Sequence, residues 1–193
     1  MKKKINIGIW GLSEHSKKNV IPSILNNKNF AIKCIFSSTN SKNNYENIRI
    51  TNEINFFLTK INLQVIYICL PINLHFKSIK QCLESNINVI CEKPITNDYN
   101  DLKILLNLAK SKKLILYESL MYQYHPSIKM LSKLISKSKP NLLEINFMIP
   151  QLKRKSFRSD KKLGASAFWD IGYYNLSLIG VFFQIDNINN FNF

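Results

Sequence analysis

Short apolar runs rich in β-branched residues alternate along this chain with segments of helical spacing, and this alternation constrains the fold more than any other feature. Strands that are separated by helices form right-handed βαβ units, and their strands pair in a parallel sheet. We therefore expect an α/β fold with a doubly wound parallel sheet. The predicted strands span residues 5–10, 30–36, 65–70, 89–91 and 114–117, and the predicted helices extend to about residue 25 and over 54–59, 75–85, 101–111 and 126–136.

Two local signals complete the prediction for this part of the chain. The stretch 37–47 is polar and predicts a loop. Asn97 precedes the helical pattern over 101–111, and a short amide side chain at that place is typical of a helix N-cap.

The pattern changes near residues 139–140 and predicts a second module. Residues 142–149 form a longer apolar run that is typical of a strand, and a basic loop and a helix-like stretch over 167–183 follow. One strand and one helix cannot close an independent core. We therefore expect a first domain over residues 1–120 and an incomplete α+β module over 121–193.

Composition excludes several classes of protein. The formal charge of +15 suggests nucleic-acid binding, but all but three of the 27 basic residues are lysines, and they are spread over every segment. This pattern favours a compositional bias over a nucleic-acid interface. No run of about 18 apolar residues is present, so we expect no membrane span. The four cysteines have no metal-ligand spacing and predict reduced thiols in a cytoplasmic core, with no bound metal.

A lysine at the end of an apolar run is the first candidate for chemistry. The run Val89–Cys91 is followed directly by Glu92, Lys93 and Pro94. In open α/β sheets, ligands bind at the carboxyl ends of the strands, where a lysine can be desolvated and take part in proton transfer. The alternative is a strand that ends in a solvated charged turn.

The turn after the first strand is a partial dinucleotide fingerprint. Gly11 begins a G-x-G-x-x-G pattern in which Ser13 and Ser16 stand where the second and third glycines belong. The Ser13 hydroxyl could donate a hydrogen bond to a phosphate in compensation. The second predicted strand is followed by Ser37 and offers no acid to bind a ribose hydroxyl, which leaves both NAD and NADP open.

Four motifs lie in order along the chain. They are YICLPINLH over 67–75, CEKP over 91–94, ESLMYQYHP over 118–126, and FR at 157–158 followed by LGASAFWDIGYY over 163–174. In this order the chain resembles the Gfo/Idh/MocA family of nicotinamide-dependent oxidoreductases, from about residue 4 to about residue 182. The resemblance implies a Rossmann domain over 1–120 that binds NAD or NADP, and over 121–193 the start of the family's substrate domain, which is shorter here than in family members.

The resemblance also implies roles for individual residues. Lys93 would orient the hydroxyl of a sugar, sugar-nucleotide or cyclitol-like substrate, Tyr174 would be the acid or base, and Asp170 would hold a substrate hydroxyl or steady Lys93. Arg158 would bind a substrate phosphate or carboxylate. The cofactor-binding residues that the resemblance implies are Gly8, Gly11, Leu12, Ser13, Ser37, Pro71, Asn73, His75, Glu92, Lys93 and Tyr122.

Several alternatives remain open from the sequence. Asp170 and Tyr174 also fit a helix N-cap and an ordinary packed aromatic residue. The glycine-poor turn and the short second module also fit a truncated or split protein that binds nucleotide without chemistry. The family's second domain usually mediates oligomerisation, so a homo-oligomer would require that domain to be completed.

Overall fold

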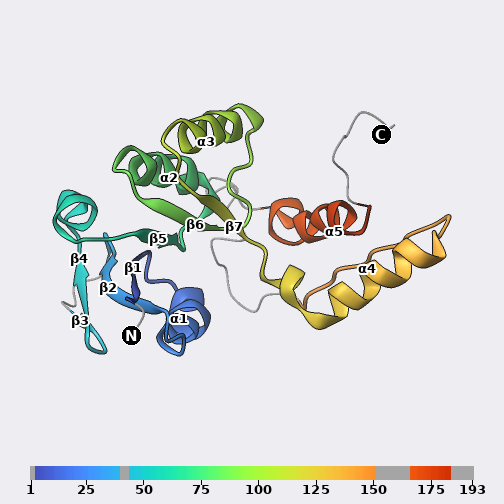
Figure 1. Cartoon of the computed structure of the whole chain (residues 1–193), viewed down its shortest axis with the longest axis horizontal. Coiled ribbons are helices and arrows are strands. Elements are labelled where there is room, and N and C mark those ends of the chain that lie inside the picture. The colour runs from blue at the N-terminus through green and yellow to red at the C-terminus, as the bar shows by residue number, and fades with distance from the viewer. Residues whose placement is uncertain (1–2, 40–43, 151–165, 184–193) are drawn as a thin grey trace. The chain divides into compact units, whose positions relative to one another are not determined.

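The computed structural model describes residues 3–39, 44–150 and 166–183 and contains two compact units, Met1–Ser119 and Leu120–Phe193. Figure 1 shows the elements of both units along the chain. Each unit is described by itself below.

A seven-stranded sheet forms the centre of the first unit, with strand order β3-β4-β2-β1-β5-β6-β7. The strands are β1 (Ile5–Trp10), β2 (Phe30–Phe36), β3 (Asn44–Tyr45), β4 (Ile48–Thr51), β5 (Val65–Ile68), β6 (Asn88–Glu92) and β7 (Leu116–Ser119). All neighbouring strands are parallel except β3 and β4, which pair antiparallel. The doubly wound α/β sheet predicted from the alternation is therefore confirmed.

Helices cover both faces of this sheet. They are η1 (Ser16–Val20), α1 (Ile21–Leu25), η2 (Phe56–Lys60), α2 (His75–Glu84) and α3 (Tyr99–Ser111); the short η3 (Ile72–Leu74) precedes α2 and has no buried residue. One buried cluster joins Phe57 of η2 and residues of α2 and α3 to one face, and a second joins Val20 and Ile21 to the other. Successive side chains of β1 point to opposite faces of the sheet and so enter different clusters: Ile7 and Ile9 belong to the second cluster and Trp10 to the first.

Two predictions about the first unit are wrong in detail. The stretch 37–47, predicted as a loop, contains β3, and the short strand β4 follows it; register pairs Ile50 with Ile35 of β2. The N-cap of α3 is Asp98 and not Asn97, because the Asp98 carboxylate accepts from the N–H groups of Asn100 and Asp101 at 2.8 and 3.0 Å. An ionised acceptor is favoured at the positive end of a helix.

All four cysteines lie in the first unit, and all are free and buried. The prediction of unpaired core thiols is confirmed. Burial is the main cause that raises the pKa of each of these thiols, Cys34, Cys69, Cys82 and Cys91.

The regular elements in the described part of the second unit are all helices. These are η4 (Met121–Tyr124), α4 (Pro126–Ser138), η7 (Phe168–Gly172) and α5 (Tyr173–Phe183). The strand predicted over 142–149 is wrong, because these residues form no regular element, and Leu142 and Met148 are 82% and 87% exposed. A strand is stabilised by hydrogen bonds to a neighbouring strand, and no described residue of this unit supplies one.

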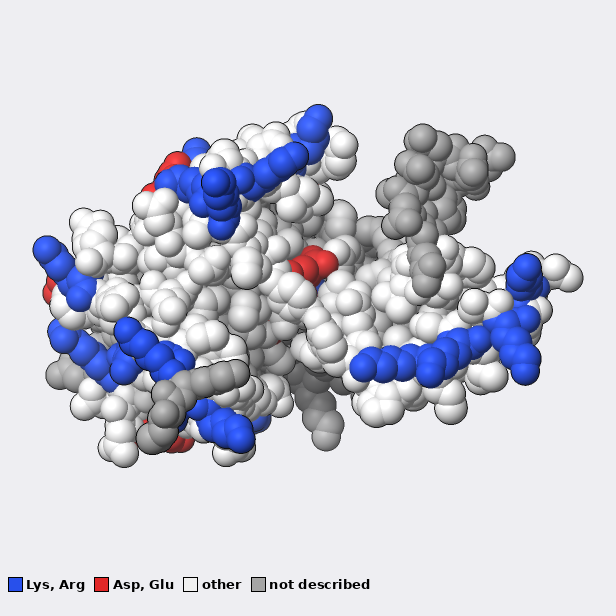
Figure 2. All heavy atoms as spheres, in the orientation of Figure 1, with Lys and Arg blue, Asp and Glu red and all other residues white. Residues whose placement is uncertain are grey.

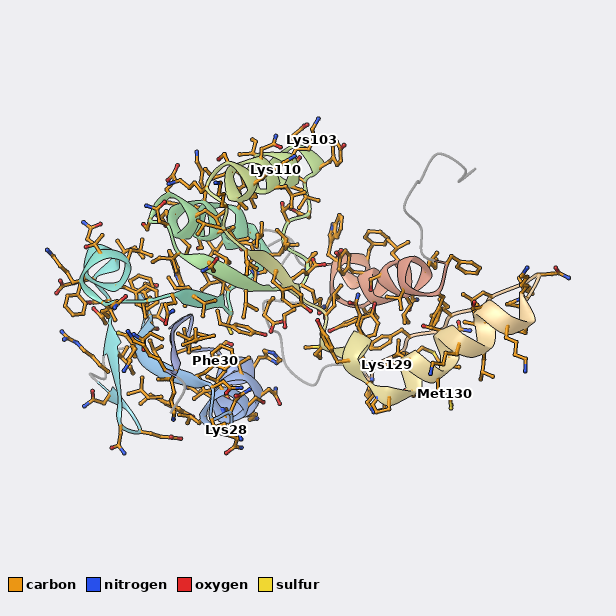
Figure 3. All side chains as sticks on the ribbon, viewed as in Figure 1. Lys28, Phe30, Lys103, Lys110, Lys129 and Met130 are labelled. Atoms are coloured by element: carbon orange, nitrogen blue, oxygen red, sulfur yellow. The ribbon has the colours of Figure 1, made fainter. Side chains whose placement is uncertain are left out.

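Lysines mark the outer faces of single helices. Figure 2 shows blue side chains over α3 and, in the second unit, along α4. Figure 3 shows Lys103 and Lys110 extending from α3, and Lys129 and Met130 extending from α4. In the described ranges, no helix has the length and apolar character that crossing a membrane requires.

Candidate functional site

The turn after β1 requires a glycine. Gly11 has a φ of +105°, and a Cβ there would lie 2.7 Å from the carbonyl oxygen of Cys69, just beyond β5. Its N–H donates to the carbonyl oxygen of Phe36 at the end of β2, at 2.9 Å. Gly11 therefore joins the carboxyl ends of three neighbouring strands at the point where the strand order reverses, which is where open α/β sheets bind ligands.

The two serines that replace the expected glycines stabilise the first helical turn. The Ser13 hydroxyl oxygen accepts from the N–H of Ser16 at 3.1 Å, and the buried Ser16 hydroxyl donates to the Ser13 carbonyl oxygen at 2.8 Å. Among the residues that the structure describes, none accepts from the N–H groups of Leu12, Ser13 and Glu14. Such N–H groups at the start of a helix are suited to an anion.

The end of β6 carries a carboxylate held by a phenol. Glu92 accepts a hydrogen bond from the hydroxyl of Tyr67 at 2.7 Å, and Tyr67 in turn lies 2.7 Å from the hydroxyl of Ser119 in β7. Burial, then the charge of Glu92, raises the pKa of Tyr67, so its phenol stays protonated and remains a donor. His15, in the first turn after Gly11, reaches the same Glu92 oxygen through Nε2 at 3.1 Å.

Lys93 follows directly on this carboxylate and is half-buried. Its peptide bond to Pro94 is cis. Two contacts fix the peptide group that follows the proline, between Pro94 and Ile95. His75 lies 2.8 Å from the Pro94 carbonyl oxygen, and the Glu118 carboxylate accepts from the N–H of Ile95 at 2.8 Å.

His75 connects two loops of the first unit. Its Nδ1 contacts the carbonyl oxygen of Pro94 and its Nε2 that of Leu70, each at 2.8 Å. Burial lowers the pKa of His75, and the two carbonyl groups and Glu92 act in the opposite direction with smaller effect. The neutral imidazole carries one N–H, so it can donate to only one of these carbonyl groups at a time.

The second unit brings together a different group of aromatic residues. The hydroxyl of Tyr122 lies 2.6 Å from that of Ser177 in α5, and its ring meets the Tyr174 ring edge-on at a centroid distance of 5.6 Å. The Tyr174 ring also stacks on Phe147 at 5.2 Å. Asp170 lies in the first turn of η7, where its N–H donates to the Ser166 carbonyl oxygen at 2.9 Å.

Residues 5–120 match the family model described as "Oxidoreductase family, NAD-binding Rossmann fold". This match covers more than half of the chain. The chain belongs to the Gfo/Idh/MocA family. The resemblance inferred from the four motifs is therefore confirmed.

Similar proteins of this family act on sugars. The chain is 26% identical over 181 residues to a dTDP-3,4-didehydro-2,6-dideoxy-alpha-D-glucose 3-reductase of Saccharopolyspora spinosa, which covers 90% of this chain and 54% of the relative. It is 24% identical over 125 residues to the D-xylose 1-dehydrogenase (NADP(+)) 2 of Haloferax volcanii, which covers 63% of this chain and 38% of the relative.

The fold also matches a solved structure. A 3-ketoreductase from Actinomadura kijaniata, in complex with NADP and TDP-benzene, superposes with a TM-score of 0.81 at 22% identity over 94% of this chain and 58% of that chain. The chain thus spans about half the length of the relatives that it matches over most of its own length.

The Gfo/Idh/MocA fold brings most of the predicted cofactor residues to one edge of the sheet. Those that end a strand or lie in the segment that follows the carboxyl end of β1, β2, β5 or β6 are Gly11, Leu12, Ser13, Ser37, Pro71, Asn73, His75, Glu92 and Lys93. Gly8 differs, because it is buried within β1 and a Cβ there would lie within 3 Å of Leu63 and Phe57. Packing accounts for this glycine, and a cofactor contact stays a prediction.

The remaining predicted residues lie elsewhere. Tyr122, Asp170 and Tyr174 belong to the second unit, and Arg158 lies outside the described residues. The grouping of Lys93 with Asp170 and Tyr174 therefore stays a prediction.

Sequence reasoning missed the side chains that surround Glu92. His15 lies inside the predicted fingerprint, and Tyr67 and Ser119 lie in the predicted strand motifs, but nothing in their spacing indicates that they share one carboxylate. The available signal was topological, since β5, β6 and β7 are neighbours and their carboxyl ends meet.

Proposed function

We propose that this chain is part of an NAD(P)-dependent oxidoreductase that transfers hydride between the nicotinamide and a secondary alcohol or ketone of a sugar, sugar-nucleotide or cyclitol-like substrate. In this proposal residues 1–120 are the dinucleotide-binding domain and residues 121–193 begin the substrate domain. One observation carries the proposal: the Gly11 turn and Lys93 both follow the carboxyl ends of central strands, at the same edge of the sheet. The family to which the chain belongs is one of NAD-binding proteins.

The first turn would hold the diphosphate of the dinucleotide. The N–H groups of Leu12, Ser13 and Glu14 and the exposed hydroxyl of Ser13 are the donors available there. The adenosine ribose would lie near Ser37, whose N–H donates to Thr51 at 2.9 Å. No acid follows β2, so both NAD and NADP fit this end of the site.

The nicotinamide supplies the hydride donor or acceptor when it is bound. Lys93 would then bind the substrate oxygen, and its ammonium would favour the charge that develops on this oxygen during hydride transfer. The contacts of His75 and Glu118 hold the Pro94–Ile95 peptide group, one residue beyond Lys93. Lys93 is thus supported by residues of α2 and β7 as well as by its own strand.

The second unit would contribute the proton-transfer residue and substrate contacts. Tyr174 is the proposed acid or base, with Asp170 and Arg158 as substrate-binding residues. Packing between Tyr122 and Phe147 fixes the ring of Tyr174, which supports a role that requires orientation. The relatives from Saccharopolyspora spinosa and Haloferax volcanii, named for a deoxysugar nucleotide and for D-xylose, support a sugar-like substrate.

Titration with NADH and NADPH tests the proposal in two steps. Binding is followed by the fluorescence of Trp10, which lies directly before Gly11, in a Trp169→Phe variant that removes the other tryptophan. Turnover is then measured with D-xylose and with dTDP-linked keto sugars. We expect saturable binding of at least one dinucleotide and turnover that is lost in Lys93→Ala and partly kept in Lys93→Arg.

Each step has its own contrary result. Binding with no turnover on any of these substrates would restrict the function to dinucleotide binding. No binding of either dinucleotide to a folded protein would refute the proposed function.

A further inference from the structure

A side-chain bridge spans the carboxyl edge of the sheet where the proposed dinucleotide would lie. His15 belongs to the turn after β1, and Glu92 ends β6, yet Nε2 of His15 and Oε1 of Glu92 are 3.1 Å apart. Strand β5 lies between β1 and β6 in the sheet. Neighbouring strands are about 4.8 Å apart, so the bridge passes over the end of β5, beside the point where the strand order reverses.

The hydrogen bonds around the bridge define which nitrogen of His15 faces Glu92 as a donor. The side-chain amide nitrogen of Asn19, one turn further along, lies 3.1 Å from Nδ1 of His15. An amide N–H that donates to Nδ1 leaves the imidazole proton on Nε2. His15 therefore directs an N–H towards the sheet edge and can donate it to an anionic oxygen.

The two ends of the bridge differ in how firmly they are held. The Glu92 side chain is 14% exposed and is anchored by the hydroxyl of Tyr67 at 2.7 Å. The His15 side chain is 44% exposed. An exposed imidazole can change its rotamer with little loss of packing, whereas a carboxylate that is 14% exposed and held by a phenol cannot, so His15 is the mobile partner.

We propose that His15 is a further ligand of the dinucleotide and exchanges the Glu92 carboxylate for the diphosphate when the cofactor binds. The exchange replaces one anionic acceptor by another, so the Nε2–H stays satisfied in both states. Glu92 keeps its bond from Tyr67. This inference rests on the proposed function, because it places the diphosphate at the Gly11 turn.

The proposal predicts opposite effects for the two ends of the bridge. His15→Ala removes a donor to the diphosphate and should weaken dinucleotide binding about tenfold, the cost of one hydrogen bond to a charged group. Glu92→Gln keeps an acceptor for Tyr67 but removes the anion that competes for His15, and should tighten binding about threefold. His15→Gln retains a side-chain N–H and should fall between His15→Ala and the wild type.

Calorimetric titration of these variants with NADPH and NADH measures these changes, with Ser23→Ala, at an exposed serine of α1, as a neighbouring control. Unchanged or tighter binding in His15→Ala would overturn the proposal. So would weaker binding in both His15→Ala and Glu92→Gln, because a purely structural brace loses the same contact in either variant. No binding to the folded wild type refutes the proposed function and this inference together.

A measurement on the wild type avoids dependence on variant folding. The chain has three histidines, so the imidazole nitrogen resonances can be assigned individually by NMR. Saturation with NADPH should shift the Nε2 resonance of His15 and the phosphorus resonances of the diphosphate. A His15 resonance that stays in place at saturation, while other signals of the Gly11 turn move, would overturn the proposal.

Discussion

The two units of this protein use apolar residues in different ways. The first places β-branched residues on a sheet between two layers of helices, and 25 of the 26 buried apolar residues in the described chain lie in it. The second has an almost wholly apolar helix, α5, none of whose residues is buried. Leu120, its first residue, is the only buried one in the described part of that unit.

This difference teaches that apolar composition does not by itself create a core. A helix buries one apolar stripe of its surface against a second layer of structure. A sheet with helices on both faces gives the helices of each face such a layer to pack against. In the second unit, α4 leaves Met130 and Leu134 58% and 53% exposed. Paired substitutions, one in each unit, can break or sharpen this comparison.

The largest expected difference concerns phenylalanine. Phe57 is fully buried and packs against Trp10 and Phe36, whereas Phe183 of α5 is 48% exposed. Phe57→Ala should lower the free energy of unfolding by about 3–5 kcal/mol because it leaves a cavity. Phe183→Ala should change it by less than about 0.5 kcal/mol. Urea unfolding, followed by far-ultraviolet circular dichroism, measures both; equal losses would contradict the comparison.

The same glycine substitution should have opposite signs in the two units. Gly11→Ala forces an alanine into a φ of +105° with its Cβ against Cys69, and should cost roughly 2–4 kcal/mol. Gly180 lies inside α5 with open space around it, and Gly180→Ala should stabilise that helix by about 0.5–1 kcal/mol. Thermal unfolding and far-ultraviolet circular dichroism detect these effects. A stabilising Gly11→Ala would show that the turn differs from the one described.

Removal of a phenol hydroxyl should matter more in the first unit. Tyr67→Phe takes a donor from the half-buried Glu92 carboxylate and a partner from Ser119, and should cost about 1–2 kcal/mol. Tyr122→Phe removes only the contact with Ser177 and should cost less than about 1 kcal/mol. Urea midpoints compare the two variants, and the reverse order would contradict the distinction between the units.

Much of the fold could be predicted from the sequence, because strands with β-branched residues and helices with a polar face leave a local signal. The antiparallel pair β3 and β4 was missed because both strands are short and β3 lies in the polar stretch 37–47. The strand predicted over 142–149 had the right composition, but a strand depends on a partner that lies elsewhere in the chain. Asn97 and Asp98 are both good caps, and only the three-dimensional start of α3 decides between them.

Only those residues of the candidate site that belong to a recognisable sequence motif were predictable. Lys93, Gly11 and His75 follow strand ends or open a helix, and their positions in the fold follow from topology. The contacts of His15 and Tyr67 with Glu92 join residues 77 and 25 positions apart, and no periodicity in the sequence reports such a pairing.

The smallest expected effect concerns pH. Because burial lowers the pKa of His75 in the folded protein, the unfolded chain binds its proton first as the pH falls below about 6.5. The free energy of unfolding should therefore decrease with falling pH in this range, and level off below the folded pKa. His75→Asn should reduce this slope, and His125→Asn in the second unit should keep it. Urea unfolding at several pH values between 7.5 and 5 tests this, and an identical slope in His75→Asn would contradict it.

All four cysteines lie in the interior of the first unit, so their reaction with a thiol reagent can report opening of this unit. A thiol reagent reacts with accessible thiolates. Burial of these four sulfur atoms blocks the reagent, and it also raises their pKa, so that the thiols stay protonated. Labelling can then proceed only when the sheet opens. The rate at which sulfur is modified in the native protein therefore measures how often the first unit opens.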